Sequence, residues 1–98
     1  MDMSLKIVNY LKTQPIEKAW LFGSFSRGEA TRKSDVDILV QFTPQSRISL
    51  FKHAHMMNDL QELLKRKVDL VEDGQLADFA VDSVEQDKIL IYERAVEG

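Results

Sequence analysis

The sequence predicts an α+β domain (α/β two-layer), in which helices flank a small mixed β-sheet. Three observations lead to this class: two segments have helical apolar periodicity, short apolar runs of strand length lie between them, and no repeat or linker interrupts the chain. The chain has 98 residues, of which 44% are hydrophobic and 30% charged. That is enough for one core, so residues 1–98 are expected to form one domain.

The first half of the chain supplies one helix and two strands. A helix is expected over residues 4–12, where apolar side chains recur at helical spacing, and Pro15 stops it. Residues 19–22 form a continuous apolar run that ends at Gly23, which predicts a buried strand. Residues 35–42 alternate between apolar and other side chains and precede a Thr-Pro pair, which predicts a second strand.

The second half begins with a longer helix. Leu50, Leu64 and the apolar residues between them at helical spacing indicate a helix over residues 49–65, with Ser49 as its N-cap. A third strand is expected over residues 67–71. The rest of the chain contains a helix through residues 79–84 and an apolar run at residues 89–92 whose type the sequence leaves open.

Composition excludes several classes of protein. The chain has no cysteine, which excludes disulfides, thiolate zinc sites and cysteine nucleophiles. It has neither a signal-peptide pattern nor an apolar run long enough to span a bilayer, so we expect a cytoplasmic protein. A net charge of −3 argues against nucleic acid as a direct ligand. The basic run Lys65–Lys67 is expected to complement the end of a helix and face water.

Two aspartates lie where a buried strand is expected. Side chains two apart on a strand point to the same face, so Asp35 and Asp37 present both carboxylates together. Such a pair repels unless a cation lies between them, and magnesium accepts carboxylates together with substrate phosphates. Asp69 lies in a third, apolar strand. If that strand is adjacent to the second, three acids can hold two divalent ions, the arrangement used in phosphoryl transfer.

A turn that can bind phosphate precedes the acids. Gly23 and Ser24 follow the first strand, and Arg27 lies in the polar stretch after them. Glycine lets backbone amides approach phosphate oxygens, Ser24 adds a hydroxyl and Arg27 a charged donor. Alone, a Gly-Ser pair is usually a surface turn and an Asp-x-Asp pair a solvated edge. Their occurrence together favours a site.

The motifs resemble those of a known superfamily. Gly23-Ser24, Arg27-Gly28, Ser34-Asp35-x-Asp37 and Val68-Asp69-Leu70 are similar to the nucleotidyltransferase superfamily that includes DNA polymerase beta and kanamycin nucleotidyltransferase. The small size is similar to that of the minimal nucleotidyltransferases (MNT). The resemblance extends from about Trp20 to Leu76. It implies a nucleotidyltransferase-like fold and transfer of a nucleoside monophosphate from a nucleoside triphosphate.

The resemblance also implies roles for residues. Gly23 and Ser24 would bind the triphosphate. Asp35 and Asp37 would ligate two Mg²⁺ ions, and Asp69 would ligate the ion that activates the acceptor hydroxyl, with acceptance of the hydroxyl proton as a second role left open. Arg27 would either bind phosphate or brace the turn. These six positions are the candidate site.

The larger members of the superfamily carry further domains for the acceptor, and none is evident in these 98 residues. MNT proteins are typically encoded with a HEPN-domain RNase toxin, and some adenylylate a tyrosine on it. The resemblance therefore implies an antitoxin that uses ATP and magnesium. Two alternatives stay open. One is a binding module that masks its partner through an apolar helix or C-terminal surface, and the other is nucleotidyl transfer to an RNA end or a small molecule.

Overall fold

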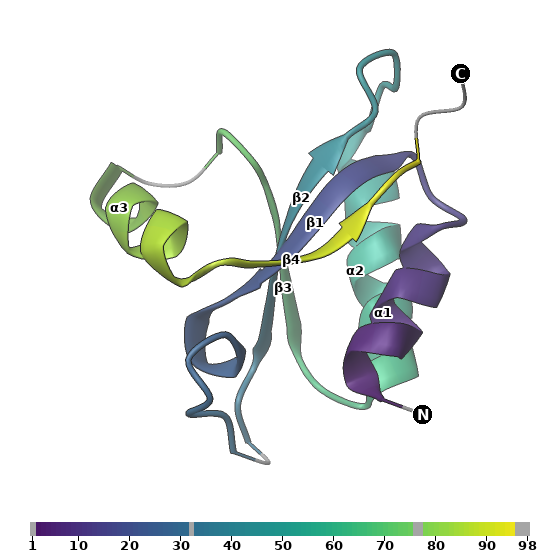
Figure 1. The fold of residues 1–98 in the computed structure, drawn as a ribbon. Coiled ribbons are helices and arrows are strands. Elements are labelled where there is room, and N and C mark those ends of the chain that lie inside the picture. Colours follow the sequence, from purple (N-terminus) through teal and green to yellow (C-terminus); the bar gives the residue numbers. More distant parts are fainter. Residues whose placement is uncertain (1, 32, 76–77, 96–98) are drawn as a thin grey trace.

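A mixed four-stranded sheet organises the computed structural model, which describes residues 2–31, 33–75 and 78–95 (Figure 1). The sheet order is β3-β2-β1-β4. The elements in chain order are α1 (Met3–Leu11), β1 (Ile16–Phe22), the 3₁₀ turn η1 (Gly23–Phe25), β2 (Val36–Phe42), α2 (Leu50–Leu64), β3 (Val68–Glu72), α3 (Asp78–Asp87) and β4 (Ile89–Glu93).

The strand directions confirm the predicted mixed sheet. β1 runs antiparallel to both β2 and β4, whereas β2 and β3 are parallel. The β2–β3 crossover contains α2, as parallel neighbours require. The adjacency of the second and third predicted strands is therefore confirmed, and their register pairs Asp37 with Asp69.

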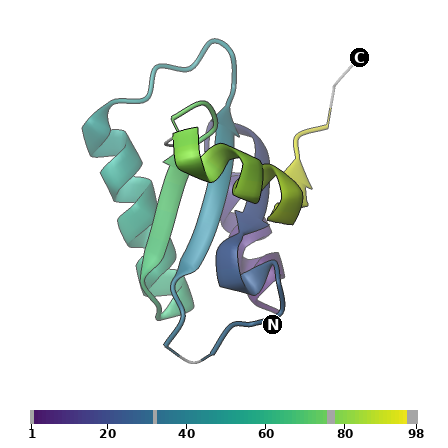
Figure 2. The same ribbon diagram turned by 90° about the vertical axis from the view of Figure 1, so that its left-hand side faces the viewer.

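The two faces of the sheet are covered differently (Figures 1 and 2). α1 and α2 lie together on one face, and α3 lies on the other. Alternate residues of β2, namely Val36, Ile38 and Val40, are fully buried towards α1 and α2. No helix in the described part of the chain is long and apolar enough to cross a membrane.

Most predicted elements are present, with differences at their ends. β1 begins at Ile16, three residues earlier than expected, because its first residues pair with the end of β2. The run at residues 89–92, left open above, belongs to β4 because it pairs with β1. Ser49 caps α2 as expected, since its hydroxyl accepts a hydrogen bond from the Lys52 amide at 3.1 Å.

The predicted apolar face of α2 is wrong at its start. Leu50 is 87% exposed, whereas Met56 and Leu60 are the buried residues of the helix. Periodicity identified the helix, but the apolar side chains of its first turn are left exposed, because the helix contributes residues to the core cluster only from Met56 onward. Leu76, the expected end of the family resemblance, lies outside the described residues.

Candidate active site

Asp35, Asp37 and Asp69 share the face of the sheet that carries α3. Asp37 pairs with Asp69 across the parallel β2–β3 ladder, and directly paired residues point to the same side. Asp35 precedes β2 by one residue and lies two positions from Asp37. Because Ile38 faces the core, Asp37 faces away from it. The topology therefore brings the three acidic positions to one face.

The carboxylate of Asp37 is electrostatically strained. Partial burial raises the pKa of Asp37 above its usual value, the charges of Asp69 and Asp35 raise it further, and the charge of Arg27 opposes them. Within the described residues, none of the three carboxylates forms a hydrogen bond or an ion pair. The three acids therefore make this face of the sheet negative, and no described cation or hydrogen-bond donor contacts their carboxylates.

The expected convergence of the three carboxylates is only partly observed. The three carboxylates share a face, and after burial the charges of Asp69 and Asp35 raise the pKa of Asp37. Within the described ranges, however, no three acidic or histidine side chains form a group that could hold a metal ion. Unpaired carboxylates repel one another, which opposes closer approach. The register pairs Asp37 with Asp69, but this pairing alone does not gather three ligands into one site.

The Gly23–Ser24 turn lies directly against Asp37. Phe22, the last residue of β1, pairs with Asp37, and η1 begins at the next residue. Gly23 has φ +69°, and a Cβ added there would overlap Oδ2 of Asp37. A side chain is therefore excluded for two reasons, backbone conformation and the adjacent carboxylate. Glycine lets the candidate phosphate turn and the acid occupy neighbouring positions.

Arg27 braces this turn. Its Nε donates to Glu29 at 2.8 Å and its Nη1 donates to Asp87 of α3 at 3.0 Å. The hydrogen bond to Asp87, followed by that to Glu29, raises the pKa of Arg27. Of the two roles expected for Arg27, the structure shows the bracing one, and contact with phosphate stays a prediction. No pattern in the sequence indicates Asp87 as a partner, because it lies 60 residues away.

Arg66 differs from the expectation that the Lys65–Lys67 run simply faces water. Its Nη1 donates to the backbone oxygens of Thr31 and Ser34, and its guanidinium lies 5.3 Å from the centre of the Phe25 ring. The reason is that α2 ends at Leu64, so Arg66 lies in the connection between α2 and β3. From there its side chain contacts the loop before β2. A lone arginine between two lysines was the only signal in the sequence.

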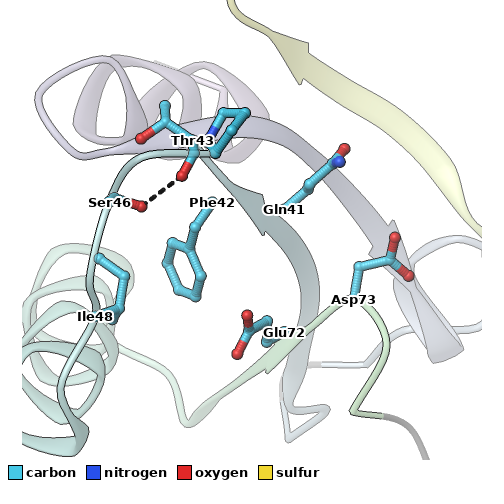
Figure 3. A pocket seen from close by; sticks show the side chains of 8 residues that line it. Gln41, Phe42, Thr43, Ser46, Ile48, Glu72 and Asp73 are labelled. Atoms are coloured by element: carbon cyan, nitrogen blue, oxygen red, sulfur yellow. Dashed lines mark hydrogen bonds between the residues drawn. The ribbon is translucent and has the colours of Figure 1, made fainter.

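A hollow of about 270 Å³ lies at the opposite end of β2 (Figure 3). Its lining residues include Phe42, Ile48, Glu72 and Asp73. Gln41, also on its wall, is four residues beyond Asp37, or about 13 Å at the strand rise of roughly 3.3 Å per residue. This hollow is therefore separate from the aspartate site.

Known proteins place the chain in a family. A family model described as "Polymerase beta, Nucleotidyltransferase" matches residues 5–97. The chain belongs to this nucleotidyltransferase family. It is 35% identical over 72 residues to the Methanocaldococcus jannaschii protein named "Putative protein adenylyltransferase MJ1379", an alignment that covers 72% of each chain. The resemblance to nucleotidyltransferase enzymes is thereby confirmed.

Solved structures confirm the fold. A toxin–antitoxin crystal structure with AMP-PNP matches with a TM-score of 0.79 and 24% identity, covering 93% of this chain and 73% of that one. A structure of a tri-AMPylated Shewanella oneidensis HEPN toxin in complex with MNT antitoxin matches with a TM-score of 0.72 and 20% identity, covering 94% and 71%. The predicted nucleotidyltransferase-like fold is correct.

Proposed function

We propose that this chain transfers AMP from ATP to a tyrosine hydroxyl of a HEPN-domain toxin, and that the modification silences the toxin. The observation that carries the proposal is the in-register pair Asp37 and Asp69 on parallel strands, immediately beside the Gly23 turn. Acids on one side and backbone amides on the other are what a nucleoside triphosphate with its divalent ions requires.

The acidic residues fit magnesium by their chemistry. Carboxylate oxygens are the ligands that a hard cation prefers. Partial burial, followed by the charges of Asp69 and Asp35, raises the pKa of Asp37, and a cation would offset this negative charge. We propose that Asp35 and Asp37 hold two ions and that Asp69 holds one of them. When bound, magnesium supplies charge neutralisation for the triphosphate and lowers the pKa of the acceptor hydroxyl.

The chain's own residues then bind, orient and accept a proton. The amides of Gly23 and Ser24 bind triphosphate oxygens, and the Ser24 hydroxyl adds a donor. Asp69 accepts the proton of the tyrosine hydroxyl. The tyrosine oxygen forms a bond to the α-phosphorus of ATP, while the bond from that phosphorus to the bridging oxygen breaks and pyrophosphate leaves. Arg27 contacts the outer phosphates if it exchanges Asp87 for them.

Two similar proteins support the choice of a toxin protein as the acceptor. The M. jannaschii relative is named for protein adenylyl transfer, and the S. oneidensis structure contains an AMPylated HEPN toxin beside an MNT antitoxin. We therefore place residues 1–98, as one minimal nucleotidyltransferase domain, in a cytoplasmic complex with a HEPN toxin.

Radiolabel transfer tests the reaction. We expect label from [α-³²P]ATP with magnesium on a tyrosine of the HEPN protein encoded next to this chain, and no label from [γ-³²P]ATP, because pyrophosphate leaves. The matched control is the double variant Asp35→Asn with Asp37→Asn, which preserves side-chain size and should transfer nothing. If the wild-type complex binds ATP and transfers no label to any tyrosine, the proposal is wrong.

The same variant tests the alternative binding module. Leu50 and Phe51, at the start of α2, are 87% and 89% exposed, so an apolar surface for masking a partner does exist. If the double aspartate variant still silences the toxin within an intact complex, masking rather than chemistry explains the antitoxin effect. Label that appears in added RNA or a small molecule instead of protein would assign a different acceptor to the same site.

A further inference from the structure

Arg66 contacts both ends of the loop that separates the phosphate turn from the aspartate pair. At one end its guanidinium lies over Phe25, the last residue of η1. At the other end its Nη1 donates to the oxygens of Thr31 and Ser34, at 2.9 and 3.3 Å. Ser34 is bonded directly to Asp35. One planar cation therefore links the turn that carries Gly23 to the residue that precedes the first acid.

The backbone beside Arg66 is fixed to the same strands. The amide of Val36 donates to the oxygen of Lys67 at 2.9 Å, which joins the start of β2 to the start of β3. The amide of Val68 donates to the Gln61 side chain at 3.1 Å, which ties that start to α2. Arg66 is three residues before Asp69, in the connection that leads directly into β3, the strand that supplies the third acid.

The side chain of Arg66 contacts both η1 and the segment just before β2. The Thr31–Ser34 turn is otherwise held by local hydrogen bonds, including Thr31 N to Ser34 Oγ at 2.8 Å. Such short-range bonds maintain the shape of a turn, but they do not fix its position relative to the sheet. A contact from a segment 32 to 35 residues further along the chain fixes that position.

From these contacts we infer that Arg66 is a positioning residue for nucleotidyl transfer: it fixes the loop before Asp35 against the phosphate turn and the start of β3. The inference rests on the proposed function for its effect on AMP transfer, whereas its structural part stands independently. Lysine cannot replace it, because only a guanidinium stacks on a ring and donates in several directions within one plane. Catalysis depends steeply on such placement, since small displacements of reacting groups cost large factors in rate.

Two variants of the complex with the HEPN partner test the inference. We expect Arg66→Gln to lower kcat for AMP transfer by about tenfold or more and to raise the magnesium concentration for half-maximal rate several-fold, since Asp35 is held less firmly. Arg66→Lys keeps the charge and should recover little of the rate. Lys67→Gln removes an adjacent exposed cation and should transfer AMP like wild type, which controls for loss of charge.

Amide hydrogen exchange supplies a readout that does not need turnover. In Arg66→Gln, the amides of Ser34 and Val36 should exchange faster than in wild type, while those in the middle of β2 should be unchanged. If Arg66→Gln is unfolded, Arg66→Lys is measured in the same way and should show the same local change.

The outcomes separate the two claims. Wild-type transfer and wild-type exchange at Ser34 and Val36 in both Arg66 variants would overturn the inference. So would full rescue by Arg66→Lys, because charge alone would then suffice. If the wild-type complex transfers no AMP, the proposed function is wrong, and the exchange rates still decide whether Arg66 positions the loop.

Discussion

The two faces of the sheet use the same strand for different purposes. On one face Val36, Ile38 and Val40 of β2 are fully buried against α1 and α2. On the other face the residue between the first two is Asp37, half-buried and paired in register with another acid. Alternation along one strand therefore separates packing from charge. Substitutions at Val36, Ile38 or Val40 should change folding, whereas substitution of Asp37 should change binding. Leu39, two residues beyond Asp37, is also fully buried, so packing continues on the second face further along the strand.

Carboxylates on the two sides are also treated differently. Asp59, on α2, accepts a hydrogen bond from the Tyr10 hydroxyl at 2.6 Å and lies 3.3 Å from His55. Asp37 has no such partner among the described residues, and its neighbours raise its pKa. The carboxylate of Asp59, which connects α1 to α2, has a hydrogen-bond donor. The carboxylate of Asp37, where a cation is proposed to bind, has none among the described residues. Electrostatic strain of this kind is typical of functional sites.

The largest effect on stability is expected on the packed face. Ile38→Ala removes a fully buried side chain from the centre of the sheet and leaves a cavity, so the free energy of unfolding should fall by about 3–4 kcal/mol. Urea denaturation measures this. Leu90→Ala, at a 49% exposed position on β4, is the control and should cost much less. Equal losses in the two variants would mean that Ile38 does not belong to the core.

A substitution on the opposite face should leave the fold intact and remove ligand stabilisation. In wild type, magnesium with AMP-PNP at a hundredfold excess over Kd should add about 2.7 kcal/mol to the free energy of unfolding. Asp37→Asn should lose most of that gain, because a proposed metal ligand is removed. Without ligand the variant should be unchanged or slightly more stable, since repulsion with Asp69 and Asp35 is relieved.

Differential scanning fluorimetry with and without ligand measures both parts of this prediction. Ile38→Val, a mild change on the packed face, is the matched control, because it should lower stability and keep the full ligand-dependent gain. An Asp37→Asn protein that is unfolded without ligand would show that Asp37 is structural.

Local patterns in the sequence were sufficient for most elements, whereas the roles of the six candidate positions stay a prediction. Periodicity located α1 and α2, and alternation located β2, with Asp37 on the face opposite to Ile38. The pairing of Asp37 with Asp69 required an assumption about strand order, which the parallel β2–β3 ladder confirms. These features depend on residues close in sequence or on a general rule of topology, which is why they could be predicted.

Features that depend on distant contacts could not be predicted. The partner of Arg27 is Asp87, on a helix whose position over the sheet no local pattern specifies. The sequence predicts a solvated cation at Arg66, because the backbone oxygens that Arg66 contacts carry no signature in the sequence. β4 is an edge strand, and its apolar run also fits a helix until its pairing with β1 is known.

The smallest predicted effect concerns the satisfied carboxylate. Burial, followed by the hydrogen bond to Asp59 and the charge of Asp59, raises the pKa of the Tyr10 hydroxyl above its usual value of 10.0. The folded protein therefore holds this proton more tightly than the unfolded chain. The stabilisation is complete below about pH 10 and is lost as pH rises further, because the unfolded chain ionises first.

Tyr10→Phe should cost about 1 kcal/mol at neutral pH, the value of a partly exposed hydrogen bond to a carboxylate. The difference in stability between wild type and Tyr10→Phe should shrink above pH 10, where urea denaturation of both proteins measures it. Asp59→Asn keeps an acceptor and removes the charge, so its stability should decline less steeply with alkaline pH than that of wild type. A constant difference between wild type and Tyr10→Phe across this range would show that the hydroxyl titrates alike in the folded and unfolded states. In that case Asp59 would not stabilise the Tyr10 proton, and the electrostatic contrast between Asp59 and Asp37 would not hold.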